Sequence, residues 1–242
     1  MRTLLIWILL AAMTSQAVHA RTWTVEKDGS GDFTIIQDAI DASAEGDTVR
    51  VGPGRFDTFR SYTSLSTGFV GMTIAWVNKG ITLVGAGRDL TFVGPADPVL
   101  EVDGFDAACV YLEGGGPSTV SGFTFENTRN YVGIIKPTIL VDCRIDGTNK
   151  TRAFRYGVTI TQTSGVIIRN VDFLGAGGIF TANSGVGTVL VENCTFWNDV
   201  PRFESRKGIA WSATDLTVRN CTFEGTGVAI GNNFGGSAVI ED

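Results

Sequence analysis

The polar and apolar positions of this chain repeat a short phrase. The clearest copies are Val191-Glu-Asn-Cys-Thr-Phe196 and Val218-Arg-Asn-Cys-Thr-Phe223, and looser copies occupy residues 120–125, 141–145 and 168–173. The residue after the polar bend of each copy is a candidate inward position, and these residues follow one another at spacings of 20, 28, 23 and 27: Phe123, Cys143, Val171, Cys194 and Cys221. Self-similarity at such a spacing predicts stacked supersecondary units, each of which contacts its neighbours along the stack.

The segments between these copies predict short strands rather than helices. They are brief apolar runs separated by Gly, Asn, Asp and Thr, and the chain holds 31 glycines. A second set of strands, which we call the front strands, is expected to begin at Gly157, Gly178, Gly208 and Gly227. Strands this short, with no helix between them, pair with the coils above and below instead of forming helix-crossover sheets.

Asparagine recurs at the bend of the repeated phrase. Asn170, Asn193 and Asn220 align there, where a residue that tolerates left-handed backbone and can hydrogen-bond along a ladder is favoured. Asn193 and Asn220 also fit the glycosylation sequence, but a ladder asparagine faces its neighbours. We therefore interpret all three as structural residues.

The pattern differs near the N-terminus, where one helix is expected. Residues 22–26 alternate as a strand, and from Thr34 the apolar positions follow a helical period in which Thr34 and Gln37 form a capping box. The apolar face holds Ile36, Ala39, Ile40 and Ser43, and residues 48–51 form the next strand. A lone amphipathic helix before a run of strands is expected to cover the open end of the stack.

The first 20 residues predict an export signal. They carry one early positive charge at Arg2, a short apolar run, and small residues before position 21, which suits signal peptidase. The run is too short to span a bilayer, so no transmembrane segment is expected after cleavage. Residues 21–242 then form one parallel β-helix domain, and the protein is expected to be secreted, periplasmic or at the cell surface.

Removal of the signal changes which chemistry is available. The single histidine, His19, leaves with it, so histidine-dependent triads, zinc sites and general bases are excluded from the mature chain. Loss of Arg2 reduces the 19 Lys and Arg residues to 18, against 25 Asp and Glu, for a net charge of −7. An acidic chain of this kind is not expected to have nucleic acid as its partner.

Four cysteines remain: Cys109, Cys143, Cys194 and Cys221. Three of them occupy the inward position of the repeat, where a small buried thiol serves as core filler. Cys194 and Cys221 belong to neighbouring coils, about 4.8 Å apart by the spacing of a sheet, and would pair if their geometry allows. The expectation is that the thiols are stacked and reduced.

The chain ends with residues 238–242, which match the repeat up to one position before the next inward residue. A terminus that closes a solenoid is expected to carry a capping element. The sequence is therefore interpreted as a fragment whose later coils are not seen.

Two segments carry a family resemblance. Residues 27–41, Lys-Asp-Gly-Ser-Gly-Asp-Phe-Thr-Ile-Ile-Gln-Asp-Ala-Ile-Asp, and residues 46–54, Gly-Asp-Thr-Val-Arg-Val-Gly-Pro-Gly, resemble the entry segment of the pectin-lyase-like superfamily, and within it the pectinesterases. The resemblance implies an all-β fold, a right-handed parallel β-helix or solenoid with a short N-terminal capping helix. It also implies a polysaccharide, usually pectin, as the substrate class.

The catalytic blocks of pectinesterases are matched only in part. Asp172-Phe-Leu-Gly175 is similar to the block that carries their nucleophile, and residues 143–151 resemble the block that carries their acid/base, with Lys150 where an aspartate belongs. Asp172 and Lys150 are therefore the candidate catalytic residues that the resemblance implies. Asp172 also aligns with Thr195 and Thr222 of other coils, and this alternative makes it an ordinary outward residue.

The front strands themselves offer no acid or base. Their expected outward positions carry no group that titrates near neutral pH: Thr159, Thr161, Phe180, Ala182, Ala210, Ser212, Ala229 and Gly231. The loops at residues 146–156 and 197–207 are richer and are expected to rise from one edge, about 10 Å apart. Together with Phe180 they supply the candidate substrate-binding residues: Arg152, Arg155, Tyr156, Phe180, Trp197, Arg202, Arg206 and Lys207.

Arginines that clamp carboxylates and rings that stack on sugar faces suit an acidic polysaccharide. The first hypothesis is thus a secreted β-helix protein that binds or processes a pectin-like polyuronate. The alternatives are a non-enzymatic, adhesin-like surface protein and a diverged pectinesterase or uronate lyase, in which a cation would stabilise the developing charge. No metal site or cofactor is predicted: Ca²⁺ would suit a lyase, but Asp28 to Asp32 is interpreted as a turn. The sequence leaves catalysis and the oligomeric state open.

Overall fold

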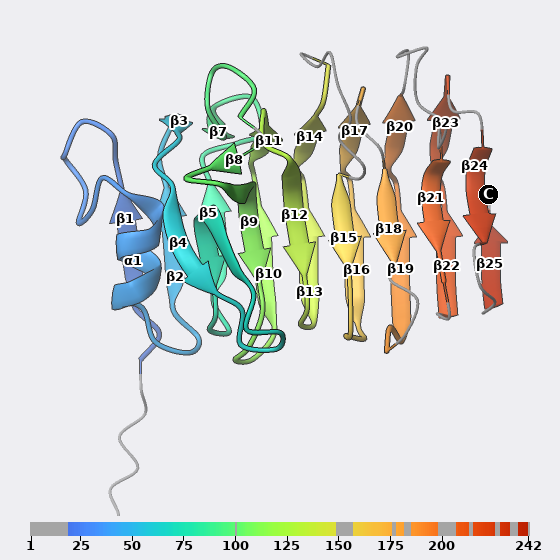
Figure 1. The fold of residues 1–242 in the computed structure, drawn as a ribbon, viewed down its shortest axis with the longest axis horizontal. Helices are drawn as coiled ribbons and strands as arrows, with labels where there is room; N and C mark the ends of the chain where they lie inside the picture. The colour runs from blue at the N-terminus through green and yellow to red at the C-terminus, as the bar shows by residue number, and fades with distance from the viewer. Residues whose placement is uncertain are drawn as a thin grey trace, which may run out of the picture.

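The computed structural model describes residues 19–99, 101–148, 157–175, 178–181, 185–197, 207–212, 215–225, 228–232 and 237–241. Its coils stack along one axis, from the blue N-terminal end to the red C-terminal end in Figure 1. Each complete coil contributes one strand to each of three sheets, which enclose a common core. The fold is a right-handed parallel β-helix, as the sequence predicts.

Sheet A is a continuous parallel stack along one side of the solenoid. Neighbouring strands pair in register without a slip, from Thr22 opposite Thr48 at one end to Glu241 opposite Arg219 at the other. Its strands, in hydrogen-bonding order, are β1 (Thr22–Val25), β2 (Thr48–Val51), β6 (Thr82–Gly85), β10 (Ser118–Ser121), β13 (Thr138–Val141), β16 (Val166–Arg169), β19 (Thr188–Glu192), β22 (Asp215–Arg219) and β25 (Ser237–Glu241).

Sheet B follows sheet A in each coil after a sharp bend. Its parallel strands are β3 (Gly54–Phe56), β7 (Thr91–Val93), β11 (Thr124–Glu126), β14 (Arg144–Asp146), β17 (Asp172–Leu174), β20 (Thr195–Trp197) and β23 (Thr222–Glu224). The repeated sequence phrase therefore spans two strands, because its first half belongs to sheet A and its second half to sheet B.

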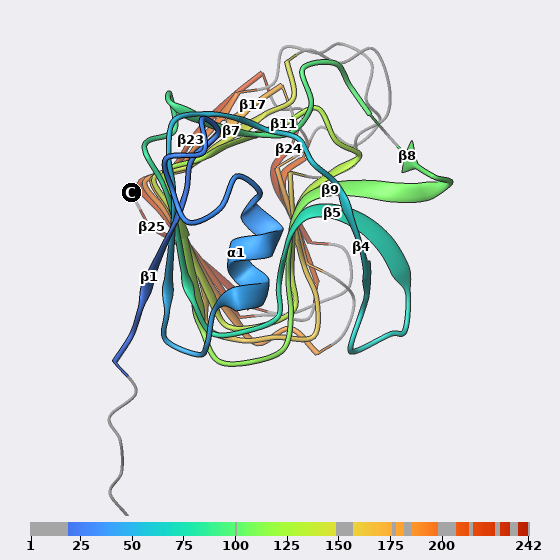
Figure 2. The ribbon, with the colours of Figure 1, turned by 90° about the vertical axis from the view of Figure 1, so that its left-hand side faces the viewer.

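Sheet C contains the predicted front strands. Its strands are β4 (Arg60–Thr63), β5 (Val70–Val77), β9 (Phe105–Leu112), β12 (Asn130–Ile134), β15 (Val158–Ile160), β18 (Ile179–Thr181), β21 (Lys207–Trp211) and β24 (Val228–Asn232). Two pairings are antiparallel: β4 with β5, and β8 (Glu101–Val102) with β9. These hairpins project from the side of the stack in Figure 2, and the sequence did not predict them.

The bends between sheets A and B explain the recurring asparagines. Asn170, Asn193 and Asn220 all have positive φ, at 54°, 53° and 49°, so each adopts the left-handed conformation that asparagine tolerates. Asn170 also donates from Nδ2 to the carboxylate of Asp142, the residue at the same bend one coil earlier, at 3.0 Å. The left-handed conformation predicted at these bends is confirmed.

Helix α1 (Ile36–Ala42) covers the N-terminal end of the stack, as Figure 2 shows in end-on view. Ile36, Ala39 and Ile40 are buried on the predicted face. The predicted capping box is wrong, since Ile35 is the N-cap and no side chain caps it. Gln37 instead accepts a hydrogen bond from the Trp76 backbone amide at 2.6 Å, because its buried side chain points toward β5.

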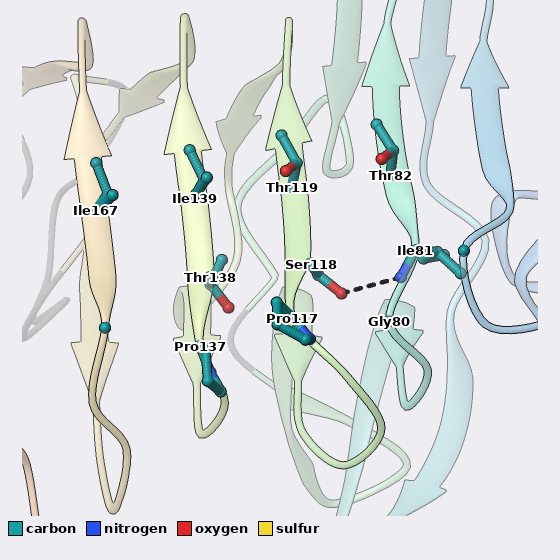
Figure 3. A pocket seen from close by; sticks show the side chains of 12 residues that line it. Gly80, Ile81, Thr82, Pro117, Ser118, Thr119, Pro137, Thr138, Ile139 and Ile167 are labelled. Atoms are coloured by element: carbon teal, nitrogen blue, oxygen red, sulfur yellow. Dashed lines mark hydrogen bonds between the residues drawn. The ribbon is translucent and has the colours of Figure 1, made fainter.

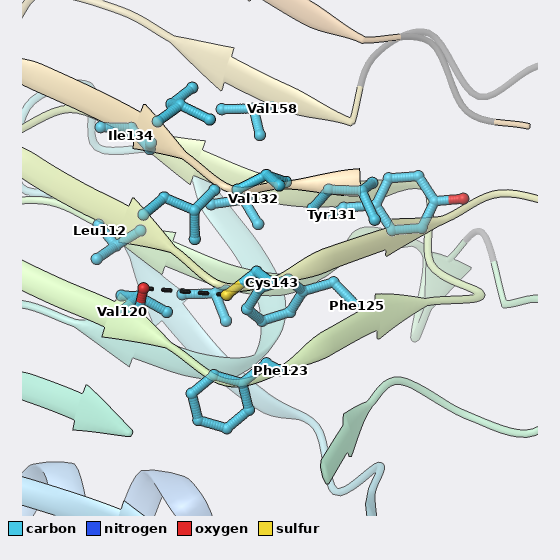
Figure 4. Close-up of a cluster of buried hydrophobic side chains, with 14 of the residues drawn as sticks. Leu112, Val120, Phe123, Phe125, Tyr131, Val132, Ile134, Cys143 and Val158 are labelled. Carbon is cyan, nitrogen blue, oxygen red and sulfur yellow. Dashed lines mark hydrogen bonds between the residues drawn. The ribbon is translucent and has the colours of Figure 1, made fainter. Parts of the chain in front are cut away.

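The interior consists of apolar side chains that stack from coil to coil. Phe173, Phe196 and Phe223 form an almost parallel column, with ring centroids 4.5 and 4.7 Å apart. Figure 4 shows part of the core nearer the N-terminus, where Cys143 packs among Phe123, Phe125 and other apolar groups. Phe123, Cys143, Val171 and Cys194 are buried, which confirms the predicted inward positions, and Cys221 is half-buried.

Candidate functional site

One row of residues crosses the outer face of sheet C, with one residue from each strand between β5 and β24. The register of the parallel pairs places them side by side along the stack: Trp76, Tyr111, Gly133, Thr159, Phe180, Ala210 and Gly231. Their chain neighbours, such as Leu112 and Ile160, point into the core and are fully buried. The outer face of sheet C therefore offers aromatic side chains on either side of a small-residue centre.

The β4–β5 hairpin forms a wall beside the first part of this row. Its turn uses Gly68, whose φ of 70° suits glycine, and Phe69 follows with 52% of its surface exposed. Tyr62 projects from β4 toward the row and is 7% exposed. Because β4 is an edge strand that pairs only with β5, Tyr62 reaches over the sheet instead of joining the core.

Two tyrosine rings form a shelf at this wall. The ring centroids of Tyr62 and Tyr111 are 4.7 Å apart, and the Tyr62 ring also lies 5.9 Å from that of Trp76. Both rings lie over glycines: a Cβ at Gly71 would come within 2.7 Å of the Tyr62 ring, and one at Gly133 within 2.5 Å of the Tyr111 ring. Such a contact is shorter than real Cβ atoms show, so the shelf depends on glycine at both positions.

The phenol groups of the shelf are neutral. Burial raises the pKa of Tyr62, and the neighbouring Tyr111 and Glu113 add to the shift. Burial likewise raises the pKa of Tyr111, against a smaller opposite effect of a hydrogen bond with the Ser64 side chain. Neither phenol can act as a base near neutral pH, and both remain hydrogen-bonding groups with an apolar ring face.

A buried carboxylate fixes the hairpin to sheet C. Glu113 is 1% exposed and follows the last residue of β9. Its oxygens accept hydrogen bonds from the Leu65 amide at 2.5 Å and from the hydroxyl groups of Ser64 and Ser66 at 3.0 and 3.1 Å. These bonds hold the turn that carries Phe69, so Glu113 sets the position of the wall.

Charged and polar groups form a rim beside the shelf. Arg129 Nη1 lies 2.8 Å from Asp106 and 3.1 Å from Glu101, so the guanidinium group bridges two carboxylates. Asn130 is exposed beside it at the start of β12, and the hydroxyl groups of Thr159 and Thr161 lie farther along the stack. The rim thus presents hydrogen-bonding groups of several kinds near the aromatic wall.

Wall, shelf and rim enclose a groove of about 210 Å³. This volume is below the 300–1,000 Å³ or so of pockets for drug-sized ligands, so it admits about one ring at a time. Its lining comes from strands β4, β9, β12 and β15 and the segments beside them: Tyr62, Phe69, Asp106, Ala108, Tyr111, Asn130, Val132, Gly133, Ile134, Ile135, Thr159 and Thr161. We call this the sheet C groove.

A second hollow lies on the outer face of sheet A and is shown in Figure 3. It has a volume of about 380 Å³, and a row of Thr82, Thr119, Ile139 and Ile167 crosses it. None of its lining residues is charged or aromatic. A shallow surface of threonine, isoleucine and proline offers less specific chemistry than the sheet C groove.

The predicted binding residue Phe180 lies on the expected face. It is the neighbour of Thr159 in the row and is partly exposed, next along the stack from the groove lining. Two other predicted outward residues are not accessible, since Ala210 and Ser212 are fully buried. The Ser212 amide donates to the Thr181 hydroxyl group at 2.8 Å, so this end of the row contributes to packing.

Asp172 lies on a different sheet from Phe180. It begins β17 in sheet B, opposite Arg144 and Thr195 in the register, and one of its oxygens is 3.0 Å from Arg88 Nη1. This placement matches the alternative of an outward residue. A catalytic role for Asp172 remains a prediction, but the structure does not bring it together with the sheet C groove.

Most of the predicted binding loops fall outside the described residues: Lys150, Arg152, Arg155, Tyr156, Arg202 and Arg206. Of Lys207 only the backbone is described, in β21. Trp197 ends β20 in sheet B and is 36% exposed, opposite Leu174 and Glu224 in the register. The predicted basic and aromatic set is thus described only at Phe180 and Trp197.

No group of three or more potential metal ligands occurs within the described ranges. The segment from Asp28 to Asp32 is a turn, in which Asp28 accepts hydrogen bonds from the amide and hydroxyl group of Ser30 at 2.9 and 2.6 Å. Asp32 accepts from Thr24 in the same way. Across the described part of the chain, no helix has the length and apolar character needed to cross a membrane.

The sequence prediction missed the residues that form the groove wall and rim. Tyr62, Phe69, Asp106 and Tyr111 belong to segments outside the repeated phrase, and none was a candidate. One signal was present: residues 70–77 form an apolar run twice as long as the repeat strands, preceded by the Gly68 turn. That combination is typical of a hairpin inserted into a solenoid.

Comparison with solved structures gives several pectin methylesterases. The enzyme from carrot has a TM-score of 0.55 at 17% identity over 83% of this chain. The PemA enzyme from Erwinia chrysanthemi and a pectin methylesterase in complex with hexasaccharide VII both have a TM-score of 0.51, at 11% and 12% identity, over 86% of this chain. At these identities the likeness concerns the fold.

The chain spans 63% of the carrot enzyme and 67% of the other two chains. No curated protein matches the sequence. The family model described as "Right handed beta helix region" matches residues 108–242, more than half of the chain. Together with the three parallel sheets, this match shows that the chain belongs to the right-handed β-helix family.

Proposed function

We propose that this protein is secreted and binds a pectin-like polysaccharide through the sheet C groove. The observation that carries the proposal is the pairing of an aromatic shelf, Tyr62 and Tyr111, with a polar rim across one groove. Sugar rings have an apolar face of C–H groups and an edge of hydroxyl groups. A groove with aromatic rings on one side and hydrogen-bonding groups on the other matches both features.

The groove is largely formed before any ligand binds. The two rings are fixed by glycine contacts beneath them, and the wall is held by three hydrogen bonds to Glu113. Side chains that are already ordered lose little conformational entropy on binding, which favours affinity. The row of residues continues along the stack to Phe180, so a chain of sugars rather than a single ring can follow the sheet.

The fold comparison supports the ligand class. Three solved structures that share this fold are named pectin methylesterases, and one is a complex with a hexasaccharide. The basic residues predicted at Arg152, Arg155, Arg202 and Arg206 lie in connections that lead into β15 and β21 of the same sheet. Arginine side chains are suited to bind the carboxylates of an acidic polysaccharide.

Binding is proposed here rather than catalysis. Among the described groove residues the only carboxylate is Asp106, which is paired with Arg129, and both tyrosines are neutral. A hydrolase or esterase mechanism with two carboxylates needs a second one nearby. Asp172 lies on sheet B and does not supply it.

The test is a titration of the full chain with a panel of oligosaccharides. The panel contains oligogalacturonides with and without methyl esters, and neutral glucan oligomers as controls. We expect saturable binding of at least one galacturonide and no binding of the glucan. Absence of binding to every galacturonide would refute the proposal and favour a structural surface protein.

Product analysis of the same mixtures separates binding from turnover. Release of methanol would indicate an esterase, and an unsaturated product that absorbs in the ultraviolet would indicate a lyase. We expect neither product. Either one would replace the proposed binding function by an enzymatic function.

A further inference from the structure

Cys194 and Cys221 occupy the same bend of neighbouring coils. Each lies between a strand of sheet A and a strand of sheet B, one residue after a left-handed asparagine. The register on both sides is continuous, with Glu192 opposite Arg219 and Thr195 opposite Thr222. The two cysteines are therefore direct neighbours along the stack.

The spacing at this bend suits a disulfide. Parallel strands lie about 4.8 Å apart, within the range of about 4.4–6.8 Å between the Cα atoms of bonded cysteines. The Thr222 amide donates to the Cys194 carbonyl group at 2.9 Å, which keeps the two bends in contact. Because both cysteines lie outside the strands, a small adjustment that brings their sulfur atoms together leaves the ladder bonds intact.

The two thiols differ in their chemistry. The interaction with the Cys194 side chain lowers the pKa of Cys221, and the Cys221 side chain is half-buried. The same interaction, followed by burial, raises the pKa of Cys194, which is 2% exposed. Cys221 is thus the thiol with the larger thiolate fraction, and the thiolate is the form that attacks a disulfide.

We propose that Cys194 and Cys221 form a redox modification site, which a small-molecule disulfide such as oxidised glutathione converts to an intramolecular disulfide. The Cys221 thiolate attacks one glutathione sulfur, so a mixed disulfide forms and one glutathione thiolate leaves. Cys194 then loses its proton and attacks the Cys221 sulfur, which releases the second glutathione as a thiol or thiolate. The cysteine pair gives up two electrons, and oxidised glutathione accepts them.

The other two cysteines lack this arrangement. At the equivalent bend after Cys143 the next coil carries Val171, so Cys143 has no thiol neighbour along the stack on that side. Burial also raises the pKa of Cys143 to about 12, and its side chain is fully buried. Cys109 is buried within β9 of sheet C. Cys143 is therefore a matched control at the same position of the repeat.

The disulfide would join two successive coils through a loop of about 27 residues, the spacing of the two cysteines. A link across a loop of this length restricts the unfolded chain and is expected to raise the melting temperature by roughly 5 °C. The added stability would be in the coils that contain β19 to β23. The described lining of the sheet C groove, from Tyr62 to Thr161, precedes both cysteines in the chain.

The experiment equilibrates the full chain in oxidised glutathione and analyses it by thiol titration and peptide mass spectrometry without reduction. We expect the four free thiols to fall to two, with one cross-linked peptide pair that contains Cys194 and Cys221. The melting temperature should rise and return to its starting value after addition of a reductant. Cys143→Ser should behave like the wild type, and Cys221→Ser should form no cross-link.

Two results would overturn the proposal. One is an unchanged thiol count with no cross-linked peptide, and the other is a lasting mixed disulfide of glutathione on Cys221 alone. Both are read from the wild-type protein, so poor folding of a serine variant would not obscure them.

Discussion

Two regions of this solenoid differ in how closely they follow its repeat. From β15 to β23 the strands are three to five residues long, and equivalent positions carry the same side chains, as in the column of Phe173, Phe196 and Phe223. Between β4 and β12 the repeat is interrupted by two antiparallel pairings and by two strands of eight residues, β5 and β9.

This difference suggests a division of roles: the regular coils stabilise the fold, and the interrupted coils determine which ligand binds. In the regular coils, identical or similar side chains stack on one another from coil to coil. This stacking gives a continuous core, and it also repeats the same kind of outer surface in each coil. In the interrupted coils, Tyr62 comes from β4 and Asp106 from the β8–β9 hairpin, which the regular coils lack, and Tyr111 occupies the row position that Thr159 has in β15. The sheet C groove lies there, where the insertion supplies side chains that the repeat cannot.

The largest effect is expected from the phenylalanine column. Phe196 is 2% exposed and stacks on both neighbours, so Phe196→Ala leaves a cavity in the regular region. We expect a loss of about 3–5 kcal/mol in the free energy of unfolding, measured by urea denaturation. Glycan affinity of the folded fraction should not change; a selective loss of affinity would mean that the two regions are not separate.

Glu113→Ala tests the anchor of the interrupted region. It removes the acceptor of three hydrogen bonds and leaves the Ser64, Leu65 and Ser66 donors without it, at a cost of about 1–3 kcal/mol in unfolding free energy. Glycan affinity, measured by calorimetry, should fall because Phe69 is no longer held.

Glu113→Gln is the matched control. Its amide oxygen can still accept from Leu65, so we expect it to restore most of the affinity. Equal affinity of Glu113→Ala and wild type would show that the wall plays no part in binding.

Gly133→Ala is a smaller change within the groove. The added Cβ would meet the Tyr111 ring and displace it, and we expect an approximately tenfold loss of affinity, equivalent to about 1.4 kcal/mol. Gly29→Ala is a control outside the groove, at a position with positive φ and open space. Calorimetric titration that gives wild-type affinity for Gly133→Ala would contradict the proposed shelf.

The smallest effect concerns a charge ladder on sheet A in the regular region. Glu192 on β19 is paired with Arg169 and Arg219 of the adjacent coils, and hydrogen bonds from both lower its pKa. A lowered folded-state pKa stabilises the fold above the unfolded value, about 4.3, and this stabilisation is lost as the pH falls through the folded value.

Because the arginines are partly exposed, we expect the ladder to contribute about 1 kcal/mol or less. Urea denaturation between pH 6 and about pH 3 measures how the free energy of unfolding depends on pH. We therefore expect this free energy to fall slightly less with falling pH for Glu192→Gln than for wild type. An identical profile would mean that the ladder has no net effect on stability.

Much of the architecture could be predicted from the repeat. The inward residues, the left-handed asparagines and the covering helix follow from local patterns that recur or stand out. The predicted capping box does not form because Gln37 accepts a hydrogen bond from the Trp76 amide. Trp76 lies 39 positions later in the chain, so a local sequence pattern does not reveal this contact. The burial of Ala210 and Ser212 likewise depends on neighbours distant in sequence.

The candidate site could be predicted only at its margin. Phe180 lies on the expected face because it belongs to a repeat strand, but Tyr62, Asp106 and Thr161 meet only through the hairpin and the stacking of several coils. Which side chains form the wall of the groove depends on where the inserted hairpin folds back over sheet C. Periodicity alone does not contain that information.

The most direct test of the account compares the affinity of wild type, Tyr111→Ala and Phe92→Ala for a galacturonide oligomer by calorimetric titration. Phe92 is the control, because it is a partly exposed aromatic residue on the outer face of sheet B. We expect a loss of affinity of tenfold or more for Tyr111→Ala, about 1.4 kcal/mol, and wild-type affinity for Phe92→Ala. Unchanged affinity of Tyr111→Ala, in a protein that binds the oligomer and folds normally, would contradict it.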